Sequence, residues 1–217
     1  MVKDKLAFIQ NQIPRTVTLV AVSKTQPISA IQEAYDFGQR VFGENKVQEL
    51  VDKYPLLPKD IKWHLIGHLQ TNKVKYIAPF IALIHSVDSF KLLQEINKQA
   101  LNNGRIIDCL LQFHVAQEET KFGLSLDDAQ EFLDSFDFAL LKNIRIVGIM
   151  GMASFTSDSS QVRSEFKALK NIFNQLKADY FSLQSDFKEI SMGMSGDFQL
   201  AIEEGSTIVR VGSSIFK

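Results

Sequence analysis

The sequence predicts an α/β protein of the (β/α)8 TIM-barrel class, a single domain over residues 1–217 with an extra helix at its N-terminus. Short apolar and β-branched runs alternate with longer segments of helical periodicity along the whole chain. Eight such runs can be proposed, and about eight βα units of ~25 residues would close into a barrel. Polar residues follow the runs at their C-terminal ends, where barrels place their sites.

The expected strands are short, and several are apolar at nearly every position. Val17–Val22 is apolar enough to be buried on both faces, as a parallel strand requires. The other expected strands are Arg40–Phe42, Trp63–Ile66, Leu83–Ser86, Ile107–Phe113, Arg145–Ile149, Glu189–Met192 and Thr207–Val211.

Helical periodicity fills the segments between these strands, and an opening helix is expected around Lys3–Gln12. Pro27 suits a first helical turn, Asp197 suits an N-cap, and three glycines stand where helices commonly end. These are Gly38, Gly104 and Gly205. The expected helices are Pro27–Phe37, Lys46–Tyr54, Gln70–Ile77, Phe90–Leu101, Leu126–Phe136, Val162–Asp179 and Phe198–Glu204, and Ser154–Ser160 is expected to be one loop.

Strict alternation of strands and helices implies parallel strands joined by right-handed crossovers. The alternative fold is an open doubly wound sheet, which would carry fewer strands and a glycine-rich first turn. This chain has Ser23, Lys24, Thr25 and Gln26 at that turn, so the barrel is favoured.

Composition excludes several classes of function. With 24 basic and 25 acidic side chains spread through 217 residues, the net charge is -1, and there is no basic patch for nucleic acid or a membrane surface. The single cysteine, Cys109, cannot form a disulfide within the chain, and no segment approaches the ~18 apolar residues of a membrane span. The N-terminus does not resemble a signal peptide. We therefore expect a cytoplasmic protein.

Lys24 directly follows the first predicted strand, at the end where α/β folds build sites. One interpretation is a lysine that simply reaches past the strand into solvent. The other is a partly desolvated amine whose neutral form attacks an aldehyde and forms a Schiff base.

Two loops rich in glycine and serine follow the seventh and eighth predicted strands, where barrels commonly bind phosphate. Their residues either make turns or offer backbone N–H groups to an anion. Arg210 lies inside the last strand and needs an acceptor, which is either an internal carboxylate or a ligand atom above the barrel mouth. The loops are Gly193-Met194-Ser195-Gly196 and Gly212-Ser213-Ser214.

The four histidines predict no metal site, because none of them is spaced as in known sites. His64 and His68 are four residues apart but span a strand and its loop. We expect His64 to be a packed residue beside Trp63, whereas His85 and His114 end separate strands and could line a pocket.

Taken together, these residues resemble the pyridoxal-phosphate homeostasis proteins, single-domain relatives of the N-terminal barrel of alanine racemase. The resemblance covers almost the whole chain and depends on the order of many short motifs. They are Leu19–Thr25, Phe42–Asn45, Val47–Glu49, Trp63–Gln70, Asn72–Lys73, His85–Asp88, Lys121–Leu124, Ser191–Ser195 and Gly205–Phe216.

The resemblance implies a binding site for pyridoxal 5'-phosphate (PLP). Lys24 would hold the aldehyde as an internal aldimine, Asn45 would lie near the cofactor, and Arg210 would face the pyridine nitrogen. The implied phosphate ligands are Ser195 and backbone groups of Met194, Gly212 and Ser213. The sequence departs from the family at His114, where the family often has Asn, and after Phe216, where the family commonly continues with a Gly and an Arg.

An arginine can only donate hydrogen bonds, so a pyridine nitrogen facing Arg210 would stay unprotonated and the cofactor would be a weak electron sink. The expected function is therefore a PLP carrier or buffer in intracellular vitamin B6 homeostasis, a monomer that serves PLP-dependent apoenzymes. The alternatives are a weak PLP-dependent amino-acid racemase and a lysine Schiff-base aldolase acting on a phosphorylated sugar. A third alternative is a regulatory binding module whose partner distinguishes the protein with bound cofactor from the protein without it.

Overall fold

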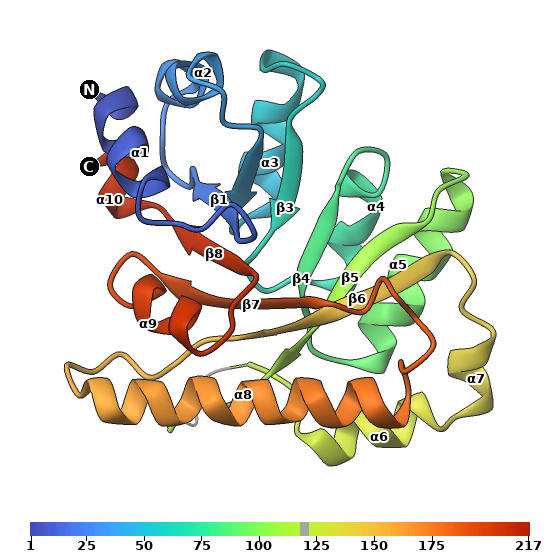
Figure 1. The fold of residues 1–217 in the computed structure, drawn as a ribbon. Coiled ribbons are helices and arrows are strands. Elements are labelled where there is room, and N and C mark those ends of the chain that lie inside the picture. Colours follow the sequence, from blue (N-terminus) through green and yellow to red (C-terminus); the bar gives the residue numbers. More distant parts are fainter. Residues whose placement is uncertain (118–121) are drawn as a thin grey trace.

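Eight parallel strands form a closed barrel in the computed structural model, which describes residues 1–117 and 122–217 (Figure 1). Each strand pairs with the next along the chain, and β8 pairs with β1. The predicted barrel is confirmed. The strands are β1 (Thr18–Val22), β2 (Val41–Glu44), β3 (Lys62–Leu65), β4 (Leu83–Val87), β5 (Ile107–Phe113), β6 (Ile144–Gly151), β7 (Glu189–Met194) and β8 (Ile208–Val211).

The register of β1 determines which residues face the barrel interior. Val20 lies beside Arg210 of β8, and Val22 lies beside Gly43 of β2. Val20 belongs to a small cluster of buried residues contributed by five strands, which fills the barrel. Because side chains alternate along a strand, Val22 and Lys24 continue the inner face beyond Val20, whereas Ser23 faces outward.

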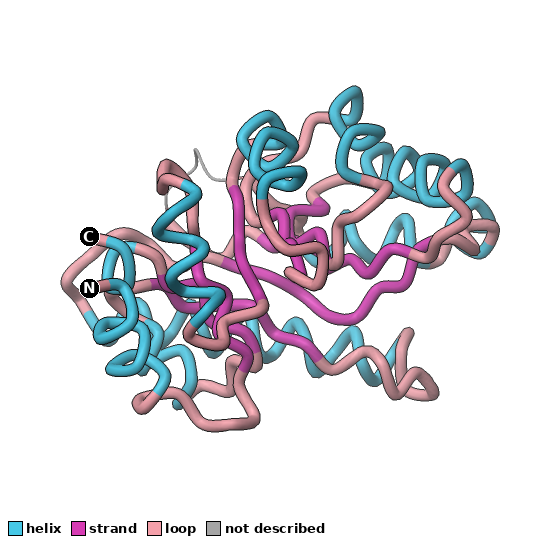
Figure 2. Tube along the Cα trace, turned by 90° about the horizontal axis from the view of Figure 1, so that it is seen from above, coloured by secondary structure: helices cyan, strands magenta, loops and turns pink. Residues whose placement is uncertain are grey.

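Helices surround the barrel, as the view from above shows (Figure 2). A second and larger core lies between the strands and these helices and includes the fully buried rings of Trp63, Phe42 and Phe166. The helices are α1 (Val2–Gln10), α2 (Ile28–Asp36), α3 (Val47–Lys53), α4 (Val74–Ile77), α5 (Phe90–Asn102), α6 (Leu126–Leu133), α7 (Phe136–Ala139), α8 (Ser159–Asp179), α9 (Phe198–Glu203) and α10 (Ser213–Phe216), with 3-10 turns η1 (Tyr54–Leu56) and η2 (Thr71–Lys73).

The two termini lie side by side, where α1 packs against α10 (Figure 1). Leu6 and Ile9 of α1 and Ile215 of α10 are buried. The extra N-terminal helix is therefore confirmed, while α10 was not predicted. In the described part of the chain, no helix has the length and apolar character needed to cross a membrane.

Side-chain caps explain why two helices have bounds that differ from the predicted ones. The expected helix Leu126–Phe136 ends at Leu133 as α6. A separate helix that was not predicted, α7, begins at Phe136, where the Ser135 hydroxyl accepts from the Phe138 N–H. Helix α8 begins at Ser159 rather than Val162, since Asp158 caps it by accepting from the N–H groups of Ser160 and Gln161.

The predicted stop signals are confirmed: Gly38, Gly104 and Gly205 have φ angles of +105°, +63° and +94° after their helices. Asp197 precedes α9 as expected, but its carboxylate accepts from the backbone N–H of Met194 and makes no capping bond to the helix.

Candidate cofactor site

Lys24 lies in a tight turn at the barrel mouth, directly after β1. Its side chain is exposed, while Ser23 before it is buried. The turn closes through a hydrogen bond from the Gln26 N–H to the Ser23 carbonyl at 3.0 Å. Thr25 has a φ of +63°, a left-handed conformation that is rare for a β-branched residue. The lysine is therefore presented by a strained turn.

The residues on both sides of Lys24 are bound by charged side chains from β2 and α3. The Ser23 hydroxyl donates to Glu44 Oε1 at 2.6 Å, and Lys53 Nζ donates to the Ser23 carbonyl at 2.8 Å. The Thr25 N–H donates to Glu49 Oε1 at 2.6 Å. Lys53 joins the two carboxylates, with Nζ at 2.8 Å from Glu44 and 2.6 Å from Glu49. Sequence reasoning missed this group, although the i,i+4 spacing of Glu49 and Lys53 on a predicted helix hinted at their pairing.

The two carboxylates of this group differ in their surroundings. Burial raises the pKa of Glu44, although hydrogen bonds from Lys53 and Ser23 oppose the shift. Its second oxygen, Oε2, is buried without a hydrogen-bond partner among the described residues. Partial burial also disfavours ionised Glu49, but hydrogen bonds from Lys53 and the Thr25 N–H outweigh it and lower the pKa of Glu49. Glu49 is therefore the firmly ionised member beside the turn.

Arg210 points into the barrel, on the inner face of β8 and deeper than Lys24. It is 4% exposed and donates to the Ser191 hydroxyl and to the Gly151 carbonyl. Burial lowers the pKa of Arg210 to about 10, while the charge of Asp197 opposes the shift. The guanidinium stays protonated near neutral pH and brings a positive charge into the site.

Two neutral histidines extend the polar contacts of Arg210 across the barrel interior. His85 Nδ1 lies 2.9 Å from Ser191 Oγ, and His85 Nε2 lies 2.9 Å from His64 Nδ1. Burial lowers the pKa of His64 to about 3. It also lowers the pKa of His85 well below the ordinary value, and the neighbouring His64 and Arg210 act in the same direction.

The histidines predicted to line a pocket lie in different places. His85 is fully buried inside the barrel, below the mouth. His114 is half-buried at the end of β5, where its backbone N–H donates to the Leu124 carbonyl at 3.1 Å. His68 lies apart from His64 and pairs with Asp88 at 2.9 Å. Lys121, part of a motif in the resemblance, lies outside the described residues.

The two predicted phosphate loops contact each other. Ser195 Oγ accepts from the Gly212 N–H at 3.2 Å, which links the end of β7 to the end of β8. The Met194 N–H donates to Asp197 Oδ1 at 2.5 Å. Two of the predicted phosphate donors are thus engaged within the loops, and Ser213 is exposed. Their roles as phosphate ligands stay predictions.

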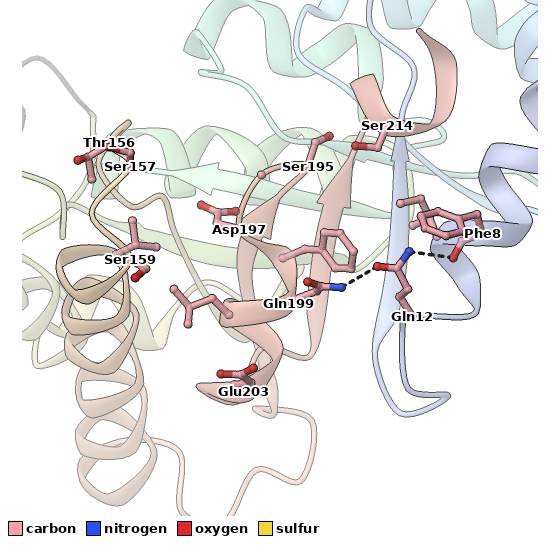
Figure 3. Close-up of a pocket in the computed structure, with 15 residues that line it drawn as sticks. Phe8, Gln12, Thr156, Ser157, Ser159, Ser195, Asp197, Gln199, Glu203 and Ser214 are labelled. Carbon is pink, nitrogen blue, oxygen red and sulfur yellow. Dashed lines mark hydrogen bonds between the residues drawn. The ribbon is translucent and has the colours of Figure 1, made fainter.

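A cavity of about 620 Å³ borders these loops (Figure 3). Ser195 and Ser214 lie at one edge, and Thr156 and Ser157 lie across from them on the loop before α8. On the far side, Gln199 Nε2 donates to Gln12 Oε1 at 2.6 Å and ties α9 to the turn after α1. The lining is rich in hydroxyl groups but includes neither Lys24 nor Arg210.

All the predicted site residues lie at the C-terminal ends of four neighbouring strands, in the order β7, β8, β1 and β2. Asn45 follows β2 on the same face as Gly43, beside the turn of Lys24. Gly67 allows the backbone of Asn45 to come close, since a Cβ at Gly67 would lie 2.4 Å from the Asn45 carbonyl oxygen. The barrel therefore brings together an amine, a guanidinium, an amide and two glycine- and serine-rich loops.

Comparisons with known proteins agree with this geometry. The family model of the alanine racemase N-terminal domain matches residues 2–217. The pyridoxal phosphate homeostasis protein of Aquifex aeolicus is 41% identical over 91% of this chain and 85% of its own. PipY of Synechococcus elongatus, solved with PLP bound, is 35% identical over 100% of both chains, with a TM-score of 0.90.

An alanine racemase from Bartonella henselae shares the fold, with a TM-score of 0.77 at 15% identity over 99% of this chain and 60% of its own. The resemblance read from the sequence motifs is confirmed by the closer relatives. This chain belongs to the family of pyridoxal phosphate homeostasis proteins.

Proposed function

We propose that this protein binds PLP covalently through Lys24 and acts as a carrier or buffer of PLP in vitamin B6 homeostasis. The observation that carries the proposal is the convergence of Lys24, Arg210 and the two glycine- and serine-rich loops at one end of four neighbouring strands. The PLP-bound structure of PipY, a relative that matches the whole chain, supports the choice of ligand.

The residues present fit the chemical groups of PLP. Its aldehyde supplies a carbon that condenses with a primary amine and releases one water, and Lys24 has an exposed primary amine at the mouth. A phosphate needs N–H and O–H donors, which the loops at Ser195 and Ser213 contain. The nearby Asp197 carboxylate accepts from the Met194 N–H, which directs one of its oxygens back to its own loop.

The protein's own groups favour capture of the aldehyde over further chemistry. Arg210 stays protonated and donates only, so it cannot deliver its proton to a ring nitrogen. His85 and His64 are held neutral by burial and supply no acid from the barrel interior. Because these residues supply no proton to a ring nitrogen, PLP bound at this site would be a weak electron sink.

Reductive trapping tests the proposal directly. Purified protein is incubated with PLP and reduced with borohydride, and the modified peptide is identified by mass spectrometry. We expect one pyridoxyl group on Lys24, lost in Lys24→Ala and kept in Lys91→Ala, which changes an exposed lysine on α5. A wild-type adduct on another lysine, or undiminished aldimine absorbance in Lys24→Ala, would contradict the proposal.

Weak racemase activity is the second candidate, because alanine racemase shares this barrel. Racemisation would need a second base opposite Lys24. Chiral analysis of amino acids incubated with the loaded protein tests it: enantiomer interconversion that disappears in Lys24→Ala would support a racemase over a carrier. We further propose a cytoplasmic monomer that passes PLP to apoenzymes, which size-exclusion chromatography and transfer assays with a purified apoenzyme can test.

A further inference from the structure

We propose that Glu49, together with Lys53 and Glu44, is a positioning residue for Lys24, and that this three-residue clamp aims the lysine amine at the bound aldehyde. The inference rests on the proposed function and adds residues outside the predicted site. Glu44 comes from the end of β2, whereas Glu49 and Lys53 come from α3.

The clamp holds the chain on both sides of Lys24. Before the lysine, the Ser23 hydroxyl binds Glu44 and the Ser23 carbonyl binds Lys53, at 2.6 and 2.8 Å. After it, the Thr25 N–H binds Glu49 at 2.6 Å. With both neighbours fixed, the direction in which the Lys24 side chain leaves the backbone is also fixed.

The conformation of Thr25 shows why an external partner is needed. A left-handed φ of +63° is disfavoured for a β-branched residue and persists only where the surroundings enforce it. The charge-assisted bond to Glu49 is the contact that tethers the backbone of Thr25 itself. Without it, Thr25 can relax to an ordinary conformation and turn Lys24 away from its present direction.

The clamp can be weakened without leaving a buried charge unpaired. The Lys53 and Glu44 side chains are 8% and 0% exposed and lie 2.8 Å apart, so each still has an oppositely charged partner if Glu49 is removed. Glu49 is the most exposed member, at 24%. Replacing Glu49 therefore releases the turn while the buried ion pair keeps the local fold.

The effect of the clamp on covalent capture at Lys24 can be measured separately from non-covalent binding of the ligand. In the covalent step, the Lys24 nitrogen bonds to the aldehyde carbon, and the two amine hydrogens leave with the aldehyde oxygen as one water. The clamp acts on that step alone, because the proposed phosphate loops belong to β7 and β8. Pyridoxamine 5'-phosphate has no aldehyde and measures binding without the covalent bond.

The experiment compares Glu49→Ala with two matched variants. Glu49→Gln keeps an acceptor oxygen at the same chain length. Asp52→Ala removes an exposed carboxylate of the same helix, bonded only to Gln48 among the contacts described. For each protein we measure covalent capture of PLP by absorbance and borohydride trapping, affinity for pyridoxamine 5'-phosphate by calorimetry, and hydrogen exchange of the Thr25 amide without ligand.

We expect Glu49→Ala to weaken covalent capture about tenfold, the effect of losing one charge-assisted hydrogen bond. Its affinity for pyridoxamine 5'-phosphate should stay unchanged and its Thr25 amide should exchange faster. Glu49→Gln should keep most of the capture, and Asp52→Ala should match the wild type.

Two results would overturn the clamp alone: unchanged capture in Glu49→Ala, or an equal weakening of PLP and pyridoxamine 5'-phosphate, which would indicate a general loosening of the site. A wild-type protein with no adduct on Lys24 would overturn the proposed function and the clamp with it.

Discussion

Arg210 shows at the scale of one residue how a charge is accommodated inside the barrel. Its guanidinium is 4% exposed and donates to a hydroxyl and a carbonyl, Ser191 and Gly151, which come from the two strands before β8. These acceptors leave the positive charge without full compensation, so it remains available to a ligand at the mouth. Arginine suits this position because its planar fork reaches two acceptors at once.

Arg210→Lys should lower the free energy of unfolding by roughly 1–3 kcal/mol, because an ammonium lacks the planar fork that reaches Ser191 and Gly151 together and one of the two buried hydrogen bonds is lost. Chemical denaturation of the ligand-free protein measures the change. The matched control is Arg163→Lys, whose guanidinium is 39% exposed and pairs with Glu203 and Glu204. Arg163→Lys should lower the free energy of unfolding by less than Arg210→Lys does. Equal losses in the two variants would contradict this account of Arg210.

At the scale of elements, strand β6 depends on a single glycine. The pairing of β5 with β6 shifts register at this point, from Cys109 beside Ile146 to Leu110 beside Gly148. Gly148 has a φ of +156°, and a Cβ there would lie 1.8 Å from the carbonyl oxygen of Glu189 on β7. The bulge therefore brings β6 and β7 together only because this residue has no side chain.

Gly148→Ala should destabilise the protein by more than about 4 kcal/mol or prevent folding, since the clash is with backbone that cannot turn aside. Gly196→Ala is the matched control, because a Cβ there meets no atom within 4 Å. It should change the unfolding free energy by less than about 0.5 kcal/mol. Thermal and urea unfolding followed by circular dichroism compare the two, and a stable Gly148→Ala variant would show that β6 and β7 can separate without loss of the barrel.

At the scale of the whole molecule, the barrel interior is an apolar cluster crossed by one polar layer. Val20, Leu110 and Ile208 belong to the apolar cluster, while His64 and His85 belong to the polar layer. Both histidines are neutral because they are buried, so folding competes with their protonation. The free energy of unfolding of the barrel therefore depends on pH.

His64 should make stability fall in acid. Its pKa is lowered from 6.5 to about 3, so its contribution is complete above pH 6.5 and is lost as the pH falls from there toward 3. The loss is at most about 1.4 kcal/mol per pH unit. Urea unfolding at a series of pH values should therefore show that the free energy of unfolding falls more steeply with decreasing pH in the wild type than in His64→Gln. Parallel curves for the two proteins would refute the linkage.

Local pattern was enough to predict the barrel and the position of Lys24, because apolar runs and helical periodicity are properties of short segments. The same applies to the loops after β7 and β8. The helix α10 was missed because four residues show no helical period. The start of α7 depends on the Ser135 cap, which was not recognised from the sequence.

By itself, the sequence determined that parallel strands alternate with helices and that Lys24, Arg210 and the glycine- and serine-rich loops belong to strands of one barrel. Only the tertiary structure decided which side chains meet. Glu49 reaches Thr25, and His85 reaches Ser191 across 106 residues of chain, because the strands close into a barrel and bring distant positions to one face. Such contacts depend on register and closure, which no short segment encodes.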